Sequence, residues 1–209
     1  MTDVAPPRPD LRRARGDRTR RAILEQGAQL ASVEGLEGLS IGRLAERLGM
    51  SKSGLYAHFR SKEELQLAAI RTAAEMYESA LVVPALDEPP GRTRLLRFVD
   101  LYLDYVRDGP FPGGCFFIAA AVDPARLRAR VKALLAEEQR KLLDFLGEAV
   151  RDGQARGEIA GEIESRRLAF SVDALLTGAD LNFVLFDDPG YLELARAEAR
   201  RLLDLPPSA

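Results

Sequence analysis

The sequence predicts an all-α protein, on two observations. Apolar residues recur every three or four positions in one segment after another, which is the spacing of amphipathic helices. No segment alternates apolar and polar residues as a half-buried strand would, and breaks rich in glycine and proline, such as residues 108–114 and 187–190, separate the helical segments. With 209 residues, of which 46% are hydrophobic and 30% charged, the chain suits a soluble protein of two modest domains.

Charge is divided unevenly along the chain. The first 65 residues hold 12 lysines and arginines against 9 acidic residues, and the remainder holds 18 against 23, for a net charge of −2. The small net charge argues against a general polyanion binder, and the positive excess marks the first part as the one that would meet an anion. A single cysteine and a single histidine offer little for disulfides or a metal cage. We therefore expect neither a metal nor a cofactor.

Residues 1–17 are expected to be a disordered arm. Three prolines are followed by the closely spaced Arg12, Arg13 and Arg15. Two interpretations stay open, a solvated tail or a basic arm that lies along phosphates or in a minor groove. No apolar signal core is present, and the longest uncharged stretch, residues 109–122, is too short to span a bilayer. These features predict a cytoplasmic protein without a membrane segment.

A first helix is predicted over residues 18–33. Ile23, Gly27 and Leu30 repeat on one side of it, and the segment 34–38, with two glycines, should end it. The next helix has Ile41 and Leu44 in an apolar stripe, with a serine positioned to cap it. Ser40 is the expected N-cap, Gly49 should end the helix, and the apolar stripe consists of Ile41, Leu44, Ala45 and Leu48. We expect the first helix to buttress this second one.

A short third helix follows after a tight turn, which makes a helix-turn-helix pattern. Ser51 can cap it, and Leu55 and Phe59 lie one turn apart, so both would face the core. The groups left toward solvent are small, cationic or hydrogen-bonding: Lys52, Ser53, Gly54 and Tyr56, with His58 on the flank. Such groups can approach base edges and phosphates. An ordinary surface helical hairpin is the alternative.

The next helix begins at a capping box formed by Ser61 and Glu64, with Lys62 in its first turn. The run GLYAHFRSKEEL resembles the N-terminal signature of the TetR family of bacterial transcriptional regulators, and the resemblance extends over residues 18–67. It implies an N-terminal three-helix helix-turn-helix DNA-binding domain, followed by a helical ligand-binding and dimerisation domain. The expected domains are the arm at 1–17, the DNA-binding domain at 18–61 and the regulatory domain at 62–205.

The resemblance also implies roles for individual residues. Lys52, Ser53 and Gly54 would approach bases, and Tyr56, His58 and Lys62 would hold phosphates; Ser40 and Ser51 complete the expected DNA-binding set. Because Ser53 and Gly54 are small, base reading would depend on Lys52 and on DNA shape. The operator sequence itself is not predictable.

Helices continue through the second part of the chain. They are expected from residue 62 to Pro84, over residues 92–107 and 115–122, and then from an Asp123 cap, with Pro124 in the first turn, to a break at Gly157. Two more span residues 165–186 and 191–203. The first of these is apolar on more than one side and should be buried. The resemblance implies a homodimer in which these last two helices form a four-helix bundle.

A small-molecule site is expected in the second part. Candidates to line it are aromatic or polar: Tyr77, Tyr102, Tyr105, Cys115, Phe116, Phe117, Asp173, Asp180 and Asn182. For the aromatic residues core packing is the alternative, and for the polar residues a hydrogen bond at the dimer interface. Cys115 is either a small buried hydrophobe or a redox-sensing thiol.

Catalytic chemistry is not expected, because a nucleophile–histidine pair would have to use His58 and no phosphate-binding glycine loop is present. The predicted function is a ligand-responsive regulator, a repressor that binds a palindromic double-stranded DNA operator as a dimer and is released by an unknown small molecule. Two alternatives remain, a helical adaptor protein and a small-molecule-binding protein without DNA affinity. Whether the outcome is repression or activation is also open.

Overall fold

The computed structural model describes residues 11–204, and it confirms the predicted all-α fold with no strand in that range. The elements are α1 (Leu11–Gly38), α2 (Ile41–Leu48), α3 (Lys52–Tyr56), α4 (Lys62–Tyr77), the π-helical turn η1 (Glu78–Val82), α5 (Val83–Leu86), α6 (Arg92–Asp108), α7 (Phe116–Ala120), α8 (Ala129–Ala155), α9 (Ser165–Phe186) and α10 (Gly190–Leu203).

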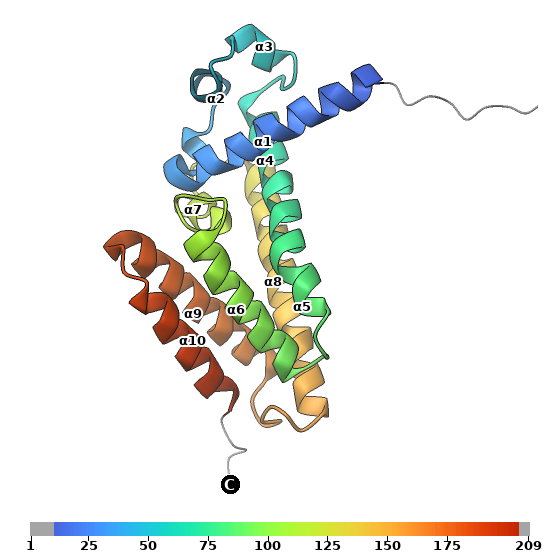
Figure 1. Ribbon diagram of the computed structural model, residues 1–209, viewed down its shortest axis with the longest axis vertical. Coiled ribbons are helices and arrows are strands. Elements are labelled where there is room, and N and C mark those ends of the chain that lie inside the picture. Colours follow the sequence, from blue (N-terminus) through green and yellow to red (C-terminus); the bar gives the residue numbers. More distant parts are fainter. Residues whose placement is uncertain (1–10, 205–209) are drawn as a thin grey trace, which may run out of the picture.

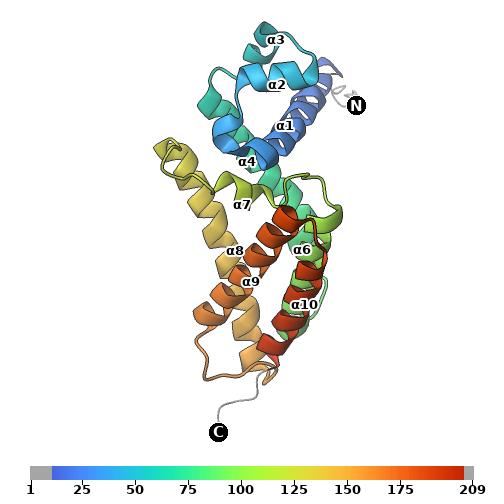
Figure 2. The ribbon, with the colours of Figure 1, turned by 90° about the vertical axis from the view of Figure 1, so that its left-hand side faces the viewer.

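The helices form two parts joined by α4. Helices α1, α2 and α3 make a small head at one end of the molecule, and α4 runs from that head down beside α8 (Figure 1). Helix α7 lies directly beneath α1, and α9 and α10 pack side by side on one flank of the second part (Figure 2). Each part therefore has its own helices, and α4 and α7 form the contacts between them.

Helix α1 begins earlier than predicted. It begins at Leu11, so the expectation of disorder over 1–17 is wrong for residues 11–17, while residues 1–10 lie outside the described range. Its C-terminal segment bends at Gly35, where φ is 70°, and continues to Gly38. The predicted break over residues 34–38 is confirmed, because the backbone of Gly35 is not helical, with φ at 70° and ψ at 168°, and the short turn after it packs Leu36 into the core.

The predicted start of the helix after α7 is wrong. Helix α8 begins at Ala129 and its N-cap is Arg128, so Asp123 does not cap it. The carboxylate of Asp123 instead pairs with Arg126 at 2.9 Å, and residues 121–128 form a turning connection whose Leu127 is buried. Asp123 therefore forms an ion pair within this connection, and α8 starts without a side-chain cap.

Two hydrophobic cores divide the buried side chains. The first unites α1, α2, the end of α3, the first half of α4 and α7, and includes Leu44, Leu55, Phe59, Ile70 and Phe116. The second unites α6, α8, α9 and α10, and includes Phe98, Leu103, Leu146 and Leu176. Tyr105 and Phe117 pack against both. The first core continues past the domain boundary expected at residue 61, because α4 supplies much of it.

Helix α9 is covered by its own chain on one side only, so the predicted burial of the whole helix requires the second copy of the predicted dimer. One side packs into the second core, but Phe170, Leu181 and Leu185 on the other side are exposed, as is Leu194 of α10. By length and hydropathy alone α9 would pass as a membrane span, with a mean hydropathy of 1.4 and a third of the window buried. Asp173 and Asp180 lie within this helix, so it is not among the uncharged stretches on which the prediction of no membrane segment rested. The apolar face that α9 shares with α10 explains the high hydropathy of this helix without a membrane.

The loop before α7 approaches the first part at Gly113. A Cβ atom there would lie 1.9 Å from the carbonyl oxygen of Ser32 in α1, and the Gly113 N–H lies 3.4 Å from the Ser32 hydroxyl that accepts its hydrogen bond. Only glycine allows this approach, which lets the two parts touch backbone to backbone.

We expect Gly113→Ala to lower the free energy of unfolding by about 1 to 3 kcal/mol, because the added methyl group must push α1 and the loop apart. Urea denaturation monitored by circular dichroism measures the change. Gly161→Ala is the matched control, since a Cβ there meets nothing within 4 Å. Equal stability of the two variants would contradict the close contact.

Candidate nucleic-acid interface

The helix-turn-helix is built as its capping residues predict. The Ser40 hydroxyl accepts a hydrogen bond from the Arg43 N–H at 3.3 Å, which starts α2. Gly49 ends α2 with φ at 62°, the left-handed conformation that glycine adopts without strain. Leu44 and Ala45 are buried beneath it. The turn therefore places the next helix across α2.

Helix α3 points its apolar residues inward. The Ser51 hydroxyl accepts from the Gly54 N–H at 3.1 Å, and both Leu55 and Phe59 are fully buried. Lys52, Ser53 and Tyr56 consequently lie on the exposed face, while Gly54 and His58 are partly buried beside it. The predicted solvent-facing set is thus gathered on one surface of the head.

Lys52 leans toward α2. A Cβ atom at Gly42 would lie 3.5 Å from the Lys52 Cε, so the lysine side chain runs over this glycine. Gly42 was not among the predicted site residues, and its proximity to Lys52 follows only from how α2 and α3 pack. The exposed surface therefore includes both helix starts.

Lys62 is engaged within the protein. Its Nζ donates to the Glu37 carbonyl at 2.6 Å and to the Glu37 carboxylate at 2.9 Å, and this contact lowers the pKa of Glu37. A role in holding phosphate requires the ammonium to be shared with, or released from, Glu37.

The predicted capping box at the start of α4 is half formed. The Ser61 hydroxyl accepts a hydrogen bond from the Glu64 N–H, as predicted, but the Glu64 carboxylate accepts from the Arg60 N–H and not from the Ser61 N–H.

The second part of the molecule gathers most of the predicted ligand-site residues around Tyr77. Its ring lies 5.7 to 6.4 Å from the rings of Tyr102, Tyr105 and Phe117, edge-on to each. The hydroxyls of Tyr77 and Tyr105 are buried and find no hydrogen-bond partner among the described residues. Burial raises the pKa of both, so they stay protonated and able to donate.

Carboxylates border this aromatic cluster. The Cys115 N–H donates to Asp180 at 3.0 Å, and burial raises the pKa of Asp180 to about 6. Asp173 accepts from Gln139 of α8 at 3.0 Å, and burial raises its pKa as well. The thiol of Cys115 has its pKa raised by burial to about 11, which disfavours the thiolate that redox sensing needs.

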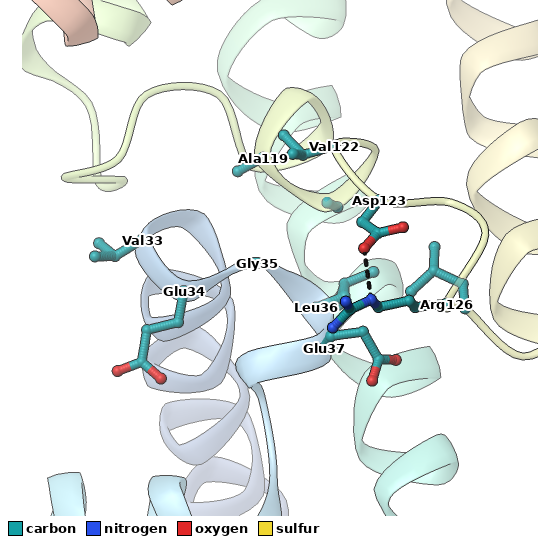
Figure 3. Close-up of a pocket in the computed structure, with 11 residues that line it drawn as sticks. Val33, Glu34, Gly35, Leu36, Glu37, Ala119, Val122, Asp123 and Arg126 are labelled. Atoms are coloured by element: carbon teal, nitrogen blue, oxygen red, sulfur yellow. Dashed lines mark ion pairs between the residues drawn. The ribbon is translucent and has the colours of Figure 1, made fainter.

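Two other predicted ligand-site residues have separate surroundings. Asn182 donates to the Gly178 carbonyl of its own helix at 2.7 Å, and Phe116 is fully buried in the first core, where its ring lies 5.3 Å from that of Phe117. A separate cavity of about 360 Å³ lies between the end of α1 and the connection after α7, where the Asp123 and Arg126 pair projects over Leu36 and Glu37 (Figure 3). This second cavity could not be predicted from the sequence, because the two segments that line it, residues 33–37 and 119–127, are far apart in the chain.

A helix-turn-helix head on a separate helical body defines a class of DNA-binding regulators. Residues 23–69 match the family model described as bacterial regulatory proteins, tetR family, and residues 91–199 match that of the tetracyclin repressor-like C-terminal domain. The chain belongs to the TetR family, and it is a DNA-binding transcriptional regulator.

Relatives cover most of the chain. The regulator TcmR of Streptomyces glaucescens is 31% identical over 74% of this chain and 67% of its own length. The repressor NemR of Escherichia coli K12 is 23% identical over 90% of this chain and 95% of its own length. Among solved structures, a TetR regulator of Chloroflexus aurantiacus is 28% identical with a TM-score of 0.82, covering 90% of this chain and 95% of its own. AibR, solved with isovaleryl coenzyme A and operator DNA, is 25% identical with a TM-score of 0.71, and the match covers 88% of this chain and 98% of AibR.

We expect Glu37→Gln to raise DNA affinity severalfold and to steepen its salt dependence by about one phosphate contact, because it removes the anionic partner of the Lys62 ammonium and leaves only the Glu37 carbonyl to hold it. Fluorescence anisotropy with labelled operator at several salt concentrations measures both. Glu25→Gln is the control, since it removes the same charge from α1 beside Arg21. If the double variant Glu37→Gln, Lys62→Ala keeps the gain, Lys62 is not the group released.

Proposed function

We propose that the protein is a homodimeric repressor that binds a palindromic operator through two copies of α3 and is released by a small molecule. The observation that carries the proposal is the outward face of α3, held by the burial of Leu55 and Phe59. On it, Lys52, Ser53 and Gly54 approach base edges. Ser40, Ser51, Tyr56, His58 and Lys62 contact the phosphates on either side.

The dimer forms through α9 and α10. Their exposed apolar residues, Phe170, Leu181, Val184, Leu185, Phe186 and Leu194, make a face that water disfavours. A second copy related by a two-fold axis buries the same face and creates a four-helix bundle. Both copies of α3 then meet one side of DNA, in major grooves 34 to 36 Å apart.

The ligand enters near Tyr77 and Tyr105. The buried hydroxyls there lack partners, and a ligand acceptor would supply them. Tyr105 packs against both cores, so a molecule bound beside it acts on the head as well as on the body. The ligand must bind the released state more tightly than the DNA-bound state, or it shifts nothing. AibR, with its coenzyme A ligand and operator, supports this two-site arrangement.

Repression is the outcome proposed, although relatives include both the repressor NemR and the activator FasR of Mycolicibacterium smegmatis. The family consists of transcriptional regulators, so the proposed role is regulatory and not catalytic. A cytoplasmic location is part of the same proposal, since the operator lies there.

The protein should shift DNA from upstream of its own coding sequence in a gel, and Leu185→Glu should abolish the specific shift. Leu185 is 67% exposed on the apolar face, so a charge there prevents dimer formation and unlinks the two α3 helices. Sedimentation velocity at micromolar concentration should then report a monomer. Leu86→Glu, at a position 49% exposed on α5, is the matched control.

A wild-type protein that is monomeric, or that shifts no DNA, would contradict this proposal. The second result would favour the adaptor. It would equally favour a ligand-binding protein without DNA affinity.

Tyr77→Phe should raise the free energy of unfolding of the ligand-free protein by about 1 kcal/mol, because it removes a buried hydroxyl that has no partner. The same change should weaken release from DNA by inducer. Thermal unfolding and operator titration measure the two effects. A loss of stability would mean that the hydroxyl has a structural partner, and the proposed ligand contact would be withdrawn.

A further inference from the structure

Helix α3 is too short to hold its own direction. It contains five residues, scarcely more than one turn, and isolated helices of that length do not persist in water. Its beginning is fixed by the Ser51 cap and its middle by Leu55. The end of the segment, at His58 and Phe59, needs a further restraint if the outward face is to meet base edges at a constant angle.

Arg20 of α1 provides a contact at that end. Its Nη1 donates to the carbonyl oxygen of His58, and its Cζ lies 4.4 Å from the centroid of the Phe59 ring. Phe59 is fully buried beneath the guanidinium. One side chain thus holds both the backbone and the ring that follow α3, across 38 residues of sequence.

The guanidinium suits this position for two reasons. Carbonyls at the end of a helical turn lack intrahelical partners and carry partial negative charge, so a cation satisfies and neutralises the His58 carbonyl. The planar group can also stack on an aromatic ring while its edge donates a hydrogen bond. A lysine could donate to the carbonyl but could not cover the ring in the same way.

We propose that Arg20 is a positioning residue for sequence recognition: it fixes the direction of α3 by holding His58 and Phe59, and it sets how well the base-reading residues fit the operator without itself contacting DNA. This inference rests on the proposed function of α3. It predicts that removing Arg20 affects the specific complex more than electrostatic attraction to any DNA, because the misplaced helix loses base contacts while phosphate contacts elsewhere persist.

Arg21 supplies the matched control. It carries the same charge one position along α1, but its side chain is 66% exposed and pairs with Glu25 one turn on. Arg20→Met and Arg21→Met therefore remove equal charge from the same helix. They differ in the contact with His58 and Phe59.

The experiment measures affinity for operator and for scrambled DNA of equal length, by anisotropy at several salt concentrations. We expect Arg20→Met to weaken operator binding at least tenfold, to leave scrambled-DNA binding within about twofold and to leave the salt slope unchanged. Arg21→Met should preserve the ratio of the two affinities. Arg20→Lys should have an operator affinity between those of the wild type and Arg20→Met. This variant keeps the test informative if Arg20→Met folds poorly.

Amide hydrogen exchange of the free protein gives a readout that does not need DNA. Exchange at residues 54–59 should accelerate in Arg20→Met and not in Arg21→Met, while α2 keeps its protection. A salt slope lowered by about 0.9, with both affinities reduced together, would make Arg20 a phosphate contact and overturn the proposal. Unchanged exchange and an unchanged affinity ratio would also overturn it. If the wild type binds no DNA, the proposed function fails, and exchange still decides whether Arg20 holds this segment.

Discussion

Burial of Leu55 and Phe59 in the first core is the constraint on which the proposed DNA-reading surface depends. Full burial of such side chains is worth about 1.5 to 3 kcal/mol each, far more than a five-residue helix gains from its own hydrogen bonds. Their position fixes which side of α3 faces outward. The exposed Lys52, Ser53 and Tyr56 are therefore a consequence of core packing, and Gly49 makes the geometry possible by turning the chain so that α3 can cross α2.

The same core extends into the regulatory part. Helix α4 supplies Ile70 and Ala73 to it and then continues through η1 to Leu81 in the second core. Tyr105 and Phe117 contact both cores, and Gly113 brings the loop before α7 against α1. A change in packing around Tyr77 thus has a continuous route of packed side chains to the head. Coupling of this kind needs two discrete arrangements of that route, which the ligand and the DNA would favour unequally.

Sequence reasoning succeeded where the determinants are local. The caps Ser40 and Ser51, the turn at Gly49 and the span of α9 follow from residues within one or two turns. It failed where a contact is made by residues that lie far apart in the sequence. The pairing of Lys62 with Glu37 and the contact of Arg20 with Phe59 join positions 25 and about 40 residues apart, and no periodicity records them. The apolar composition of α9 alone could not tell whether its cover comes from the same chain or from another, and the prediction of a second copy came from the family resemblance.

The central claim is that two copies of α3 are presented together to one side of a DNA duplex. Pulsed electron resonance between spin labels at position 57, introduced as Ala57→Cys in a Cys115→Ala background, measures their separation in the operator complex; Ala57 is exposed at the end of α3 and lies outside the expected DNA-binding set. The account predicts one narrow distance distribution at about 35 Å, the spacing of successive major grooves on one face. Absence of dipolar coupling, or a separation that matches no such pair of grooves, would contradict it.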